Sequence, residues 1–215
     1  MSIAGSAAAP IVPDPFRILV VCTGNICRSA QGEQLLRARI PVELQGVFEI
    51  RSAGTGALVG APMPEEAAAL SRHYGGSPDA HRGQDITAEL VRESDLVLAM
   101  AAEHRSGAVQ LAPRASRYGF MFTEFGALLD DLSNNLPEPL LDEALPQHPL
   151  TTRLRALVRM AAGRRGFLPA EDAEPKDIVD PYRRSQQVYD ESAAQVSAGV
   201  DRILNAVVRI AGQVR

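Results

Sequence analysis

A short, nearly continuous apolar run near the start of the chain, residues 16–21, constrains the fold more than any other feature. A strand that is apolar at successive positions is typical of a parallel sheet covered on both faces. The run leads into a polar, glycine-bearing loop at 22–29 and then into a helical stretch at about 29–40, which Pro41 closes. A strand, a loop and a helix in this order predict a βαβ unit.

The same alternation continues along the chain. Further strands are expected at residues 47–51, 95–100 and 117–122, the first of them followed by a turn at 52–56. A helical stretch starts at 64 and stops at 75–76, and a long amphipathic helix is expected at about 183–210. Strands that alternate with helices predict an α/β fold with a doubly wound parallel sheet.

Two parts of the chain depart from this alternation. Residues 1–15 are small, rich in alanine and without period, so we expect a flexible N-terminal tail. Residues from about 127 to 177 hold several prolines, a cluster of acidic residues and one amphipathic helix at 151–162, but no strand. About fifty residues without a strand indicate an insertion in a compact α/β domain. The folded domain is therefore expected at 16–215, with the insertion inside it.

Composition and charge exclude several classes of protein. Of the 215 residues, 46% are hydrophobic and 22% are charged, as in globular domains. No run approaches the roughly 20 apolar residues of a membrane helix, and the net charge of −4 gives no reason to expect nucleic acid or an anionic membrane as a partner. Two cysteines cannot build a disulfide-dense scaffold or a four-cysteine zinc site. We expect a cytoplasmic enzyme.

The loop at 22–29 carries the chemistry, and it reads Cys22-Thr23-Gly24-Asn25-Ile26-Cys27-Arg28-Ser29. A loop between a parallel strand and a helix points its backbone N–H groups inward, where they bind a tetrahedral oxyanion and stabilise a thiolate at Cys22. Arg28 can hold two phosphate oxygens and stabilise a pentacoordinate transition state. The Ser29 hydroxyl can donate to the sulfur, Gly24 lets the loop tighten, and Asn25 tolerates a left-handed conformation.

This loop resembles the signature of the low-molecular-weight protein tyrosine phosphatases, Cys-x-Gly-Asn-x-Cys-Arg-Ser. The resemblance extends to Ser52-Ala53-Gly54-Thr55, to His81, to residues 95–100 and to Asp180-Pro181-Tyr182. It implies a single domain with a four-stranded parallel sheet flanked by helices. It also implies catalysis through a phosphocysteine at Cys22, with no cofactor and no metal.

The sequences of residues 56–60 and 180–185 are similar to those of the bacterial branch of the family, which is paired with exopolysaccharide tyrosine kinases. The resemblance therefore implies a phosphotyrosine-bearing protein as the partner, with a bacterial tyrosine kinase as one candidate. It also implies that phosphate or sulfate can occupy the loop.

A carboxylic acid is needed to protonate the leaving tyrosyl oxygen and then to activate water. Two Asp-Pro pairs compete for this role. Asp14 precedes the first strand and would lie at its amino end, opposite the site. Asp180 lies before the last helix, where a loop can return to the carboxyl edge of the sheet. Position therefore selects Asp180, and the resemblance agrees.

The other candidate site residues are expected to bind the phosphoryl group or to support the loop. Phosphoryl contacts are expected from the loop, and Tyr182 is expected to form the aromatic wall; the loop residues are Thr23, Gly24, Asn25, Ile26, Cys27 and Ser29. The resemblance makes Ser52 and His81 supports of the loop, together with Asn25. Two interpretations of Cys27 stay open: a small buried hydrophobic residue, or the partner of Cys22 in a reversible disulfide, as the resemblance implies.

Departures from the family pattern concern recognition. Ala57 and Leu58 stand where many members have an aromatic residue, and Gln84 stands where arginine is more common. We assign no role to the other three histidines, which are His73, His104 and His148.

Three other functions share this type of loop. Thioredoxin-coupled arsenate reductases need two further cysteines, and the chain has none beyond Cys27. Arginine phosphatases of the same family carry threonine where this chain has Ile26. The resemblance implies that the bulkier, apolar Ile26 favours an aryl phosphate. A phosphoryl-binding scaffold without turnover would need neither Cys22 nor Asp180. The sequence therefore favours a cysteine-dependent phosphatase that acts on phosphotyrosine in proteins.

Overall fold

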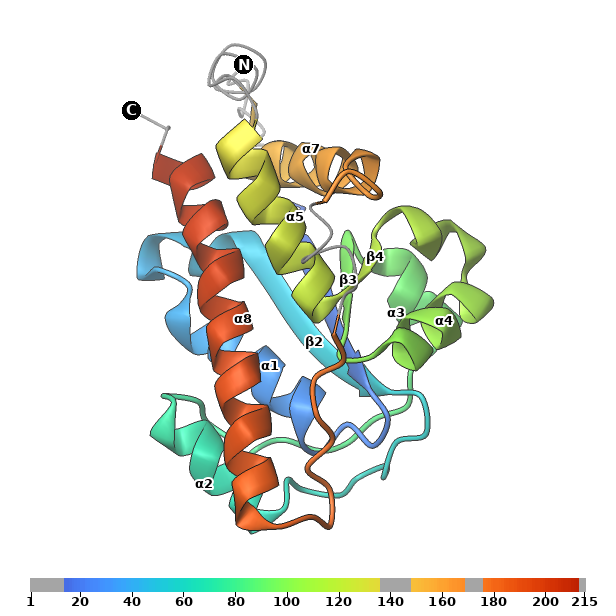
Figure 1. The fold of residues 1–215 in the computed structure, drawn as a ribbon, viewed down its shortest axis with the longest axis vertical. Helices are drawn as coiled ribbons and strands as arrows, with labels where there is room; N and C mark the ends of the chain where they lie inside the picture. Colours follow the sequence, from blue (N-terminus) through green and yellow to red (C-terminus); the bar gives the residue numbers. More distant parts are fainter. Residues whose placement is uncertain (1–13, 136–147, 169–175, 213–215) are drawn as a thin grey trace, which may run out of the picture.

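The computed structural model describes residues 14–135, 148–168 and 176–212 (Figure 1). Within these residues, four parallel strands form one sheet in the order β2-β1-β3-β4. The strands are β1 (Phe16–Cys22), β2 (Phe48–Gly54), β3 (Leu96–Ala99) and β4 (Gly119–Met121). The predicted four-stranded parallel sheet is therefore confirmed. Since β1 lies between β2 and β3, the loop that follows it opens at the middle of the carboxyl edge.

Helices cover both faces of the sheet. They are α1 (Arg28–Arg39), α2 (Glu65–His73), α3 (Ala88–Glu93), α4 (Ala102–Leu111), α5 (Phe122–Asn135), α7 (Leu150–Gly163) and α8 (Gln186–Gly212), with short 3₁₀ helices at Val42–Val47 and Pro113–Arg117. Figure 1 shows α8 running along one face beside α1 and α5, while α3 and α4 lie on the other side.

The apolar run at residues 16–21 supplies both faces of β1. Ile18 and Val20 pack among residues of α1, α5, α7 and α8. Leu19 and Val21 point the other way and pack among residues of α3 and α4. A strand that is buried on both faces needs apolar residues at successive positions, which explains why the pattern does not alternate.

Several boundaries differ from the predicted ones. The predicted turn at 52–56 begins too early, because β2 continues to Gly54 in register with Cys22. The helices α3 and α4 were not predicted, and neither was α5. In α5, Phe125, Leu128 and Leu129 are buried at helical spacing and belong to the main core. This helix crosses residue 127, where the sequence indicates the start of an insertion.

The α7 helix, which occupies the predicted position 151–162 almost unchanged, is tied to the edge of the sheet. Arg155 pairs with Asp95 at 2.8 Å and with Asp14 at 2.7 Å. Beyond the helix, the Arg165 guanidinium lies 4.0 Å from the ring centroid of Phe120 and donates to the carbonyl of Gly119. Residues 1–13 of the expected tail lie outside the described residues. Among the described helices, none is long and apolar enough to cross a membrane.

Candidate active site

The loop after β1 wraps around the sulfur of Cys22. The backbone N–H of Asn25 donates to Sγ at 3.3 Å, and the Ser29 hydroxyl lies 2.9 Å from it. Asn25 adopts the left-handed conformation, with φ of 53°, which turns the chain back toward the start of α1. A hydroxyl, a backbone N–H and a helix N-terminus are the groups that stabilise a thiolate in proteins.

Asn25 is held by hydrogen bonds at its side chain and its backbone. Its Nδ2 donates to Oγ of Ser29 at 2.9 Å and to Oγ of Ser52 at 2.8 Å, while its Oδ1 accepts from the backbone N–H of Gln84 at 2.9 Å. Nε2 of His81 lies 2.6 Å from its carbonyl oxygen. Gln84 also donates from Nε2 to the carbonyl of Ser52, at 2.8 Å. The structure thus places both expected support residues, Ser52 and His81, against one loop residue.

The network continues to Glu33, which the sequence pattern did not indicate as a site residue. The Ser52 hydroxyl donates to Glu33, whose side chain lies on the inner side of α1. Glu33 also pairs with Arg37 at 2.9 Å, one turn further along the helix. The spacing of Glu33 and Arg37 is visible in the sequence, but it is typical of an exposed helical ion pair.

Arg28 connects the loop to the segment that carries the expected acid. Its guanidinium is 5% exposed; Nη1 donates to the carbonyl of Ile178 at 3.2 Å, and Nη2 lies 2.9 Å from Oδ2 of Asp180. Nη2 also lies 3.4 Å from the Thr23 hydroxyl. Asp14, the rival acid, pairs with Arg17 and lies near the start of β1. The structure therefore brings Asp180 to the loop and leaves Asp14 at the opposite edge.

The segment 176–180 is anchored along the carboxyl edge of the sheet. The N–H of Ile178 donates to the carbonyl of Met100, directly after β3, at 2.8 Å. The carboxylate of Asp177 accepts from the N–H of Ala102 at 2.9 Å. These bonds hold the backbone at Ile178 and directly before it, and the carbonyl of Ile178 accepts from Arg28.

The loop and this segment enclose a cavity of about 160 Å³. Charged groups and sulfur atoms line part of the cavity, and apolar side chains form its walls. Leu58 and Tyr182, two of these apolar side chains, are partly exposed. The lining residues are Cys22, Thr23, Gly24, Ile26, Cys27, Arg28, Gly56, Leu58, Asp180 and Tyr182. Gly54, at the end of β2, lets this strand lie close to the loop, because a Cβ at position 54 would lie 2.3 Å from the carbonyl oxygen of Thr23. The cavity suits a phosphoryl group on an apolar stem.

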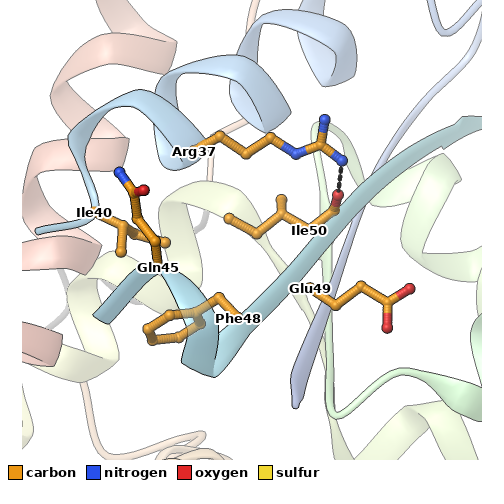
Figure 2. Close-up of a pocket in the computed structure, with 6 residues that line it drawn as sticks. All are labelled: Arg37, Ile40, Gln45, Phe48, Glu49 and Ile50. Carbon is orange, nitrogen blue, oxygen red and sulfur yellow. Dashed lines mark hydrogen bonds between the residues drawn. The ribbon is translucent and has the colours of Figure 1, made fainter. Parts of the chain in front are cut away.

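A wider cavity, of about 370 Å³, opens at the amino edge of the sheet (Figure 2). Figure 2 shows the Arg37 guanidinium bonded to the carbonyl of Ile50, with Glu49 beyond it. The residues that line this cavity are Arg37, Ile40, Gln45, Phe48, Glu49 and Ile50, and they include no nucleophile. Chemistry, rather than size, therefore identifies the smaller cavity as the candidate active site.

Comparison with known families agrees with this geometry. The family model described as "Low molecular weight phosphotyrosine protein phosphatase" matches residues 17–147. The chain belongs to this family. The match includes the whole loop, β1 from residue 17 onward, β2 to β4 and α1 to α5. Asp180 and Tyr182, which also line the cavity, lie beyond the matched residues.

Two curated relatives of the phosphatase cover different shares of it. The low molecular weight protein-tyrosine-phosphatase Etp of Escherichia coli K12 is 44% identical over 108 residues, which are 50% of this chain and 70% of Etp. The probable low molecular weight protein-tyrosine-phosphatase EpsP of Ralstonia nicotianae is 30% identical over 184 residues, which are 86% of this chain and 90% of EpsP. The longer match to EpsP extends beyond the region that the family model covers.

Solved structures share the fold. The tyrosine phosphatase Wzb of Escherichia coli K30, solved in complex with sulphate, is 28% identical with a TM-score of 0.57, over 87% of this chain and 95% of Wzb. The YwlE arginine phosphatase of Geobacillus stearothermophilus, 23% identical over 88% of this chain and 90% of YwlE, has a TM-score of 0.61 and shows the fold alone.

The two cysteines of the phosphatase are free, and they differ in environment. Burial and the neighbouring Cys22 raise the pKa of Cys27 to about 12. Cys27 packs among Ile26, Ala30 and Tyr189, whose own pKa burial raises to about 12. Cys27 therefore stays a neutral thiol at pH 7, which suits a packing residue better than a nucleophile. Among the described residues, no group of three His, Cys, Asp or Glu side chains is placed to hold a metal ion.

Proposed function

We propose that this phosphatase hydrolyses phosphotyrosine on proteins through a phosphocysteine at Cys22. The observation that supports this proposal is the meeting of Cys22, Arg28 and Asp180 in one cavity, with Arg28 only 2.9 Å from Asp180. A nucleophile, an anion-binding guanidinium and an acid are the three groups that phosphate ester hydrolysis needs. Cys22 and Arg28 belong to one loop, whereas Asp180 comes from a distant part of the sequence.

In the first step, Sγ of Cys22 attacks phosphorus and the bond from phosphorus to the tyrosyl oxygen breaks. Asp180, protonated, gives its proton to the departing oxygen. The loop N–H groups and Arg28 hold the phosphoryl oxygens while charge builds on them. The Ser29 hydroxyl lies 2.9 Å from Sγ of Cys22, where it can donate a hydrogen bond to the sulfur during the attack.

In the second step, the Asp180 carboxylate takes a proton from water, and the water oxygen attacks phosphorus. The sulfur–phosphorus bond breaks, which releases inorganic phosphate and returns the thiolate. Since Nη2 of Arg28 faces Asp180 in the structure, this contact must loosen when a phosphoryl group takes the guanidinium. Binding of substrate thereby frees the carboxyl group for its catalytic role.

The walls of the cavity support an aryl phosphate as the substrate. Leu58 and Tyr182 present apolar surface at the mouth, and Ile26 lines the same cavity. We therefore place the phosphotyrosine ring between Leu58 and Tyr182. A phosphoarginine side chain, whose guanidinium is polar, would leave these walls without a matching surface.

The remaining proposals concern setting and organisation. We infer that a bacterial tyrosine kinase or another phosphotyrosine protein is the partner, and that phosphate or sulfate can occupy the loop.

Two free thiols in one catalytic pocket support a reducing compartment, the cytoplasm. We retain a domain at 16–215 with an insertion at about 127–177, although α5 runs through its first residues.

A direct assay tests the function. Purified protein is given a phosphotyrosine peptide, a phosphoarginine peptide and arsenate with thiol, alongside its Cys22→Ser variant. We expect phosphate release from phosphotyrosine, little from phosphoarginine, and none with Cys22→Ser. Preferred release from phosphoarginine, or reduction of arsenate, would establish the corresponding alternative. Tight binding of phosphate without turnover of any substrate would instead indicate a scaffold.

A further inference from the structure

A fully buried histidine contacts the active-site loop and has no part in the mechanism above. His104 lies in the first turn of α4, directly beyond the carboxyl end of β3, and its relative exposure is 0%. Because β3 is the neighbour of β1, this turn lies beside the loop that follows β1. Nε2 of His104 is 2.8 Å from Oγ1 of Thr23, the residue directly after Cys22.

The Thr23 hydroxyl stands between His104 and Arg28. A threonine hydroxyl has one proton to donate and two lone pairs that accept. A guanidinium can only donate, so the 3.4 Å contact from Nη2 of Arg28 uses one lone pair of Thr23. The 2.8 Å contact to His104 is the shorter of the two, so the histidine determines where the hydroxyl oxygen lies.

Two observations indicate that His104 is the donor in this contact. A carboxylate oxygen of Glu103 lies 3.4 Å from Nε2, which favours a hydrogen on that nitrogen. The other ring nitrogen, Nδ1, is buried and has no hydrogen-bond partner among the described residues. An unpaired buried acceptor is tolerated more readily than an unpaired buried N–H, so the ring hydrogen belongs on Nε2. Both lone pairs of Thr23 are then used, by His104 and by Arg28.

The ring is neutral at physiological pH. Burial and the positive charge of Arg28 lower the pKa of His104 to about 4, against the opposing effect of the carboxylates of Asp177 and Asp180. A neutral ring donates a hydrogen bond without adding positive charge beside the guanidinium. It therefore does not compete with Arg28 for the phosphoryl group.

We propose that His104 is a positioning residue of the phosphatase reaction: its Nε2–H holds the Thr23 hydroxyl, which in turn holds the Arg28 guanidinium where the phosphoryl oxygens bind. The proposal rests on the role of Arg28 in the proposed function. Among the residues that the structure describes, Arg28 is also held by Ile178 and Asp180, and the Thr23 hydroxyl adds a further support. Ile178 and Asp180 both belong to the segment at 176–180. The His104–Thr23 pair supports Arg28 from the other side of the loop, from residues that follow β3 and β1.

A double-mutant cycle tests whether His104 acts through Thr23. His104→Leu removes the ring nitrogens at similar size, and Thr23→Val removes only the hydroxyl. We expect each to lower kcat/KM for an aryl phosphate about tenfold, the equivalent of one charge-assisted hydrogen bond. The double variant should lose no more than either single variant. Multiplied losses would overturn the proposal, because His104 would then act independently of Thr23.

Two further variants separate positioning from folding. His104→Gln keeps an N–H donor and should recover most of the lost rate, whereas a histidine that only fills space would be replaced better by leucine. His73→Leu, at an exposed histidine on α2, is the matched control and should leave kcat/KM unchanged. A lower rate for the glutamine variant than for the leucine variant would contradict the proposal.

Binding of inorganic phosphate makes the test independent of turnover. In the Cys22→Ser background, His104→Leu and Thr23→Val should each weaken phosphate binding in calorimetry by a similar factor, because Arg28 holds the phosphate oxygens. Unchanged binding would refute the positioning role even if the enzyme is active. If His104→Leu and Thr23→Val weaken phosphate binding but the parent protein with Cys22 intact turns over no phosphotyrosine, the proposed function is refuted, while the placement of Arg28 by His104 and Thr23 stands.

Discussion

Nη2 of Arg28 lies 2.9 Å from Oδ2 of Asp180, so the anion-binding group and the acid of the cavity face each other before substrate arrives. The two side chains differ in burial, at 5% exposed for Arg28 and 53% for Asp180. The guanidinium is therefore the fixed partner and the carboxylate the movable one. A phosphoryl group that enters the loop competes with Asp180 for Arg28, which links substrate binding to release of the acid.

This relationship predicts opposite effects of Asp180→Asn on catalysis and on binding. Loss of the acid should lower kcat by a factor on the order of 10² or more for phosphotyrosine, and less for aryl phosphates with good leaving groups. Loss of the competing negative charge should leave inhibition by inorganic phosphate as strong as before or stronger. Steady-state kinetics with a series of aryl phosphates and a phosphate inhibition constant measure both effects.

Asp14→Asn is the matched control, since Asp14 also precedes a proline but lies at the amino edge of the sheet. It should leave kcat and the inhibition constant unchanged. If Asp180→Asn lowers kcat equally for good and poor leaving groups, Asp180 does not protonate the leaving oxygen.

The hydrogen bonds behind Asn25 predict that Ser52→Ala affects both activity and stability. Ser52 accepts from Asn25 and donates to Glu33, so alanine leaves a buried amide and a largely buried carboxylate each short of one partner. We expect a loss of about 1–3 kcal/mol in the free energy of unfolding. Urea unfolding measures this loss, and kcat/KM should fall with it because Asn25 shapes the loop.

Glu33→Gln is the control for the carboxylate charge. Glutamine keeps an oxygen that accepts from Ser52 but cannot pair as an ion with Arg37, whose side chain is 57% exposed. Such a partly exposed ion pair contributes little, so the variant should lose well under the amount lost by Ser52→Ala. An equal loss in both variants would show that the charge of Glu33, rather than the hydrogen bond from Ser52, supports the loop.

The sheet and the loop could be predicted because their signals are local. An apolar run at 16–21 that ends in Cys22 requires only short-range reasoning. Asparagine tolerates the left-handed conformation that Asn25 adopts, although residue type alone does not require it. The choice of Asp180 over Asp14 needed one topological argument, that ligands bind at the carboxyl edge of a parallel sheet.

The unpredicted parts depend on which elements pack together. His104 and Glu33 are polar residues on helices, which usually face solvent. Both are buried here, His104 because β3 lies next to β1 and Glu33 because α1 covers the face of β2 that carries Ser52. Strand order cannot be read from the strands themselves. The α5 helix was missed for another reason, since the prolines and acidic residues after it concealed the helical spacing of Phe125, Leu128 and Leu129.

The environment of Cys27 predicts a packing role during turnover. Its thiol is buried among apolar residues, and its pKa is raised to about 12. Cys27→Ala should therefore change kcat by less than about threefold and cost roughly 1 kcal/mol of stability for the small cavity. Kinetics and urea unfolding provide both values. Loss of activity comparable with that of Cys22→Ser would assign Cys27 a direct part in the reaction.

Peroxide treatment separates the two interpretations of Cys27. If Cys27 forms a reversible disulfide with Cys22, activity lost to excess peroxide returns with dithiothreitol in the parent protein but not in Cys27→Ala, where the Cys22 sulfenic acid is oxidised further to the irreversible sulfinic acid. If Cys27 only packs, the two proteins recover to the same extent. The high pKa of Cys27 disfavours its thiolate, so we expect similar recovery at pH 7.

The burial of His104 predicts how stability depends on pH. Its pKa is about 4 in the folded protein against an ordinary value of 6.5, which we take for the unfolded chain. Between pH 6.5 and 4, the unfolded chain binds a proton that the folded protein does not, so stability falls as pH decreases through this window. Above pH 6.5 both states are neutral, and below pH 4 both are protonated, so the dependence from this group ends at each limit.

The size of this effect is on the order of 2–3 kcal/mol across the window. His104→Leu removes it, so the parent and the variant should differ in their stability change between pH 7 and pH 4.5, while carboxylates that titrate in both proteins cancel. Urea unfolding at pH 7, 5.5 and 4.5 measures the difference, with His73→Leu as the exposed control that keeps the parent slope. If the free energy of unfolding changes equally with pH in the parent and in His104→Leu, the pKa of His104 is the same in the folded and unfolded states. The ring is then not held neutral beside Arg28.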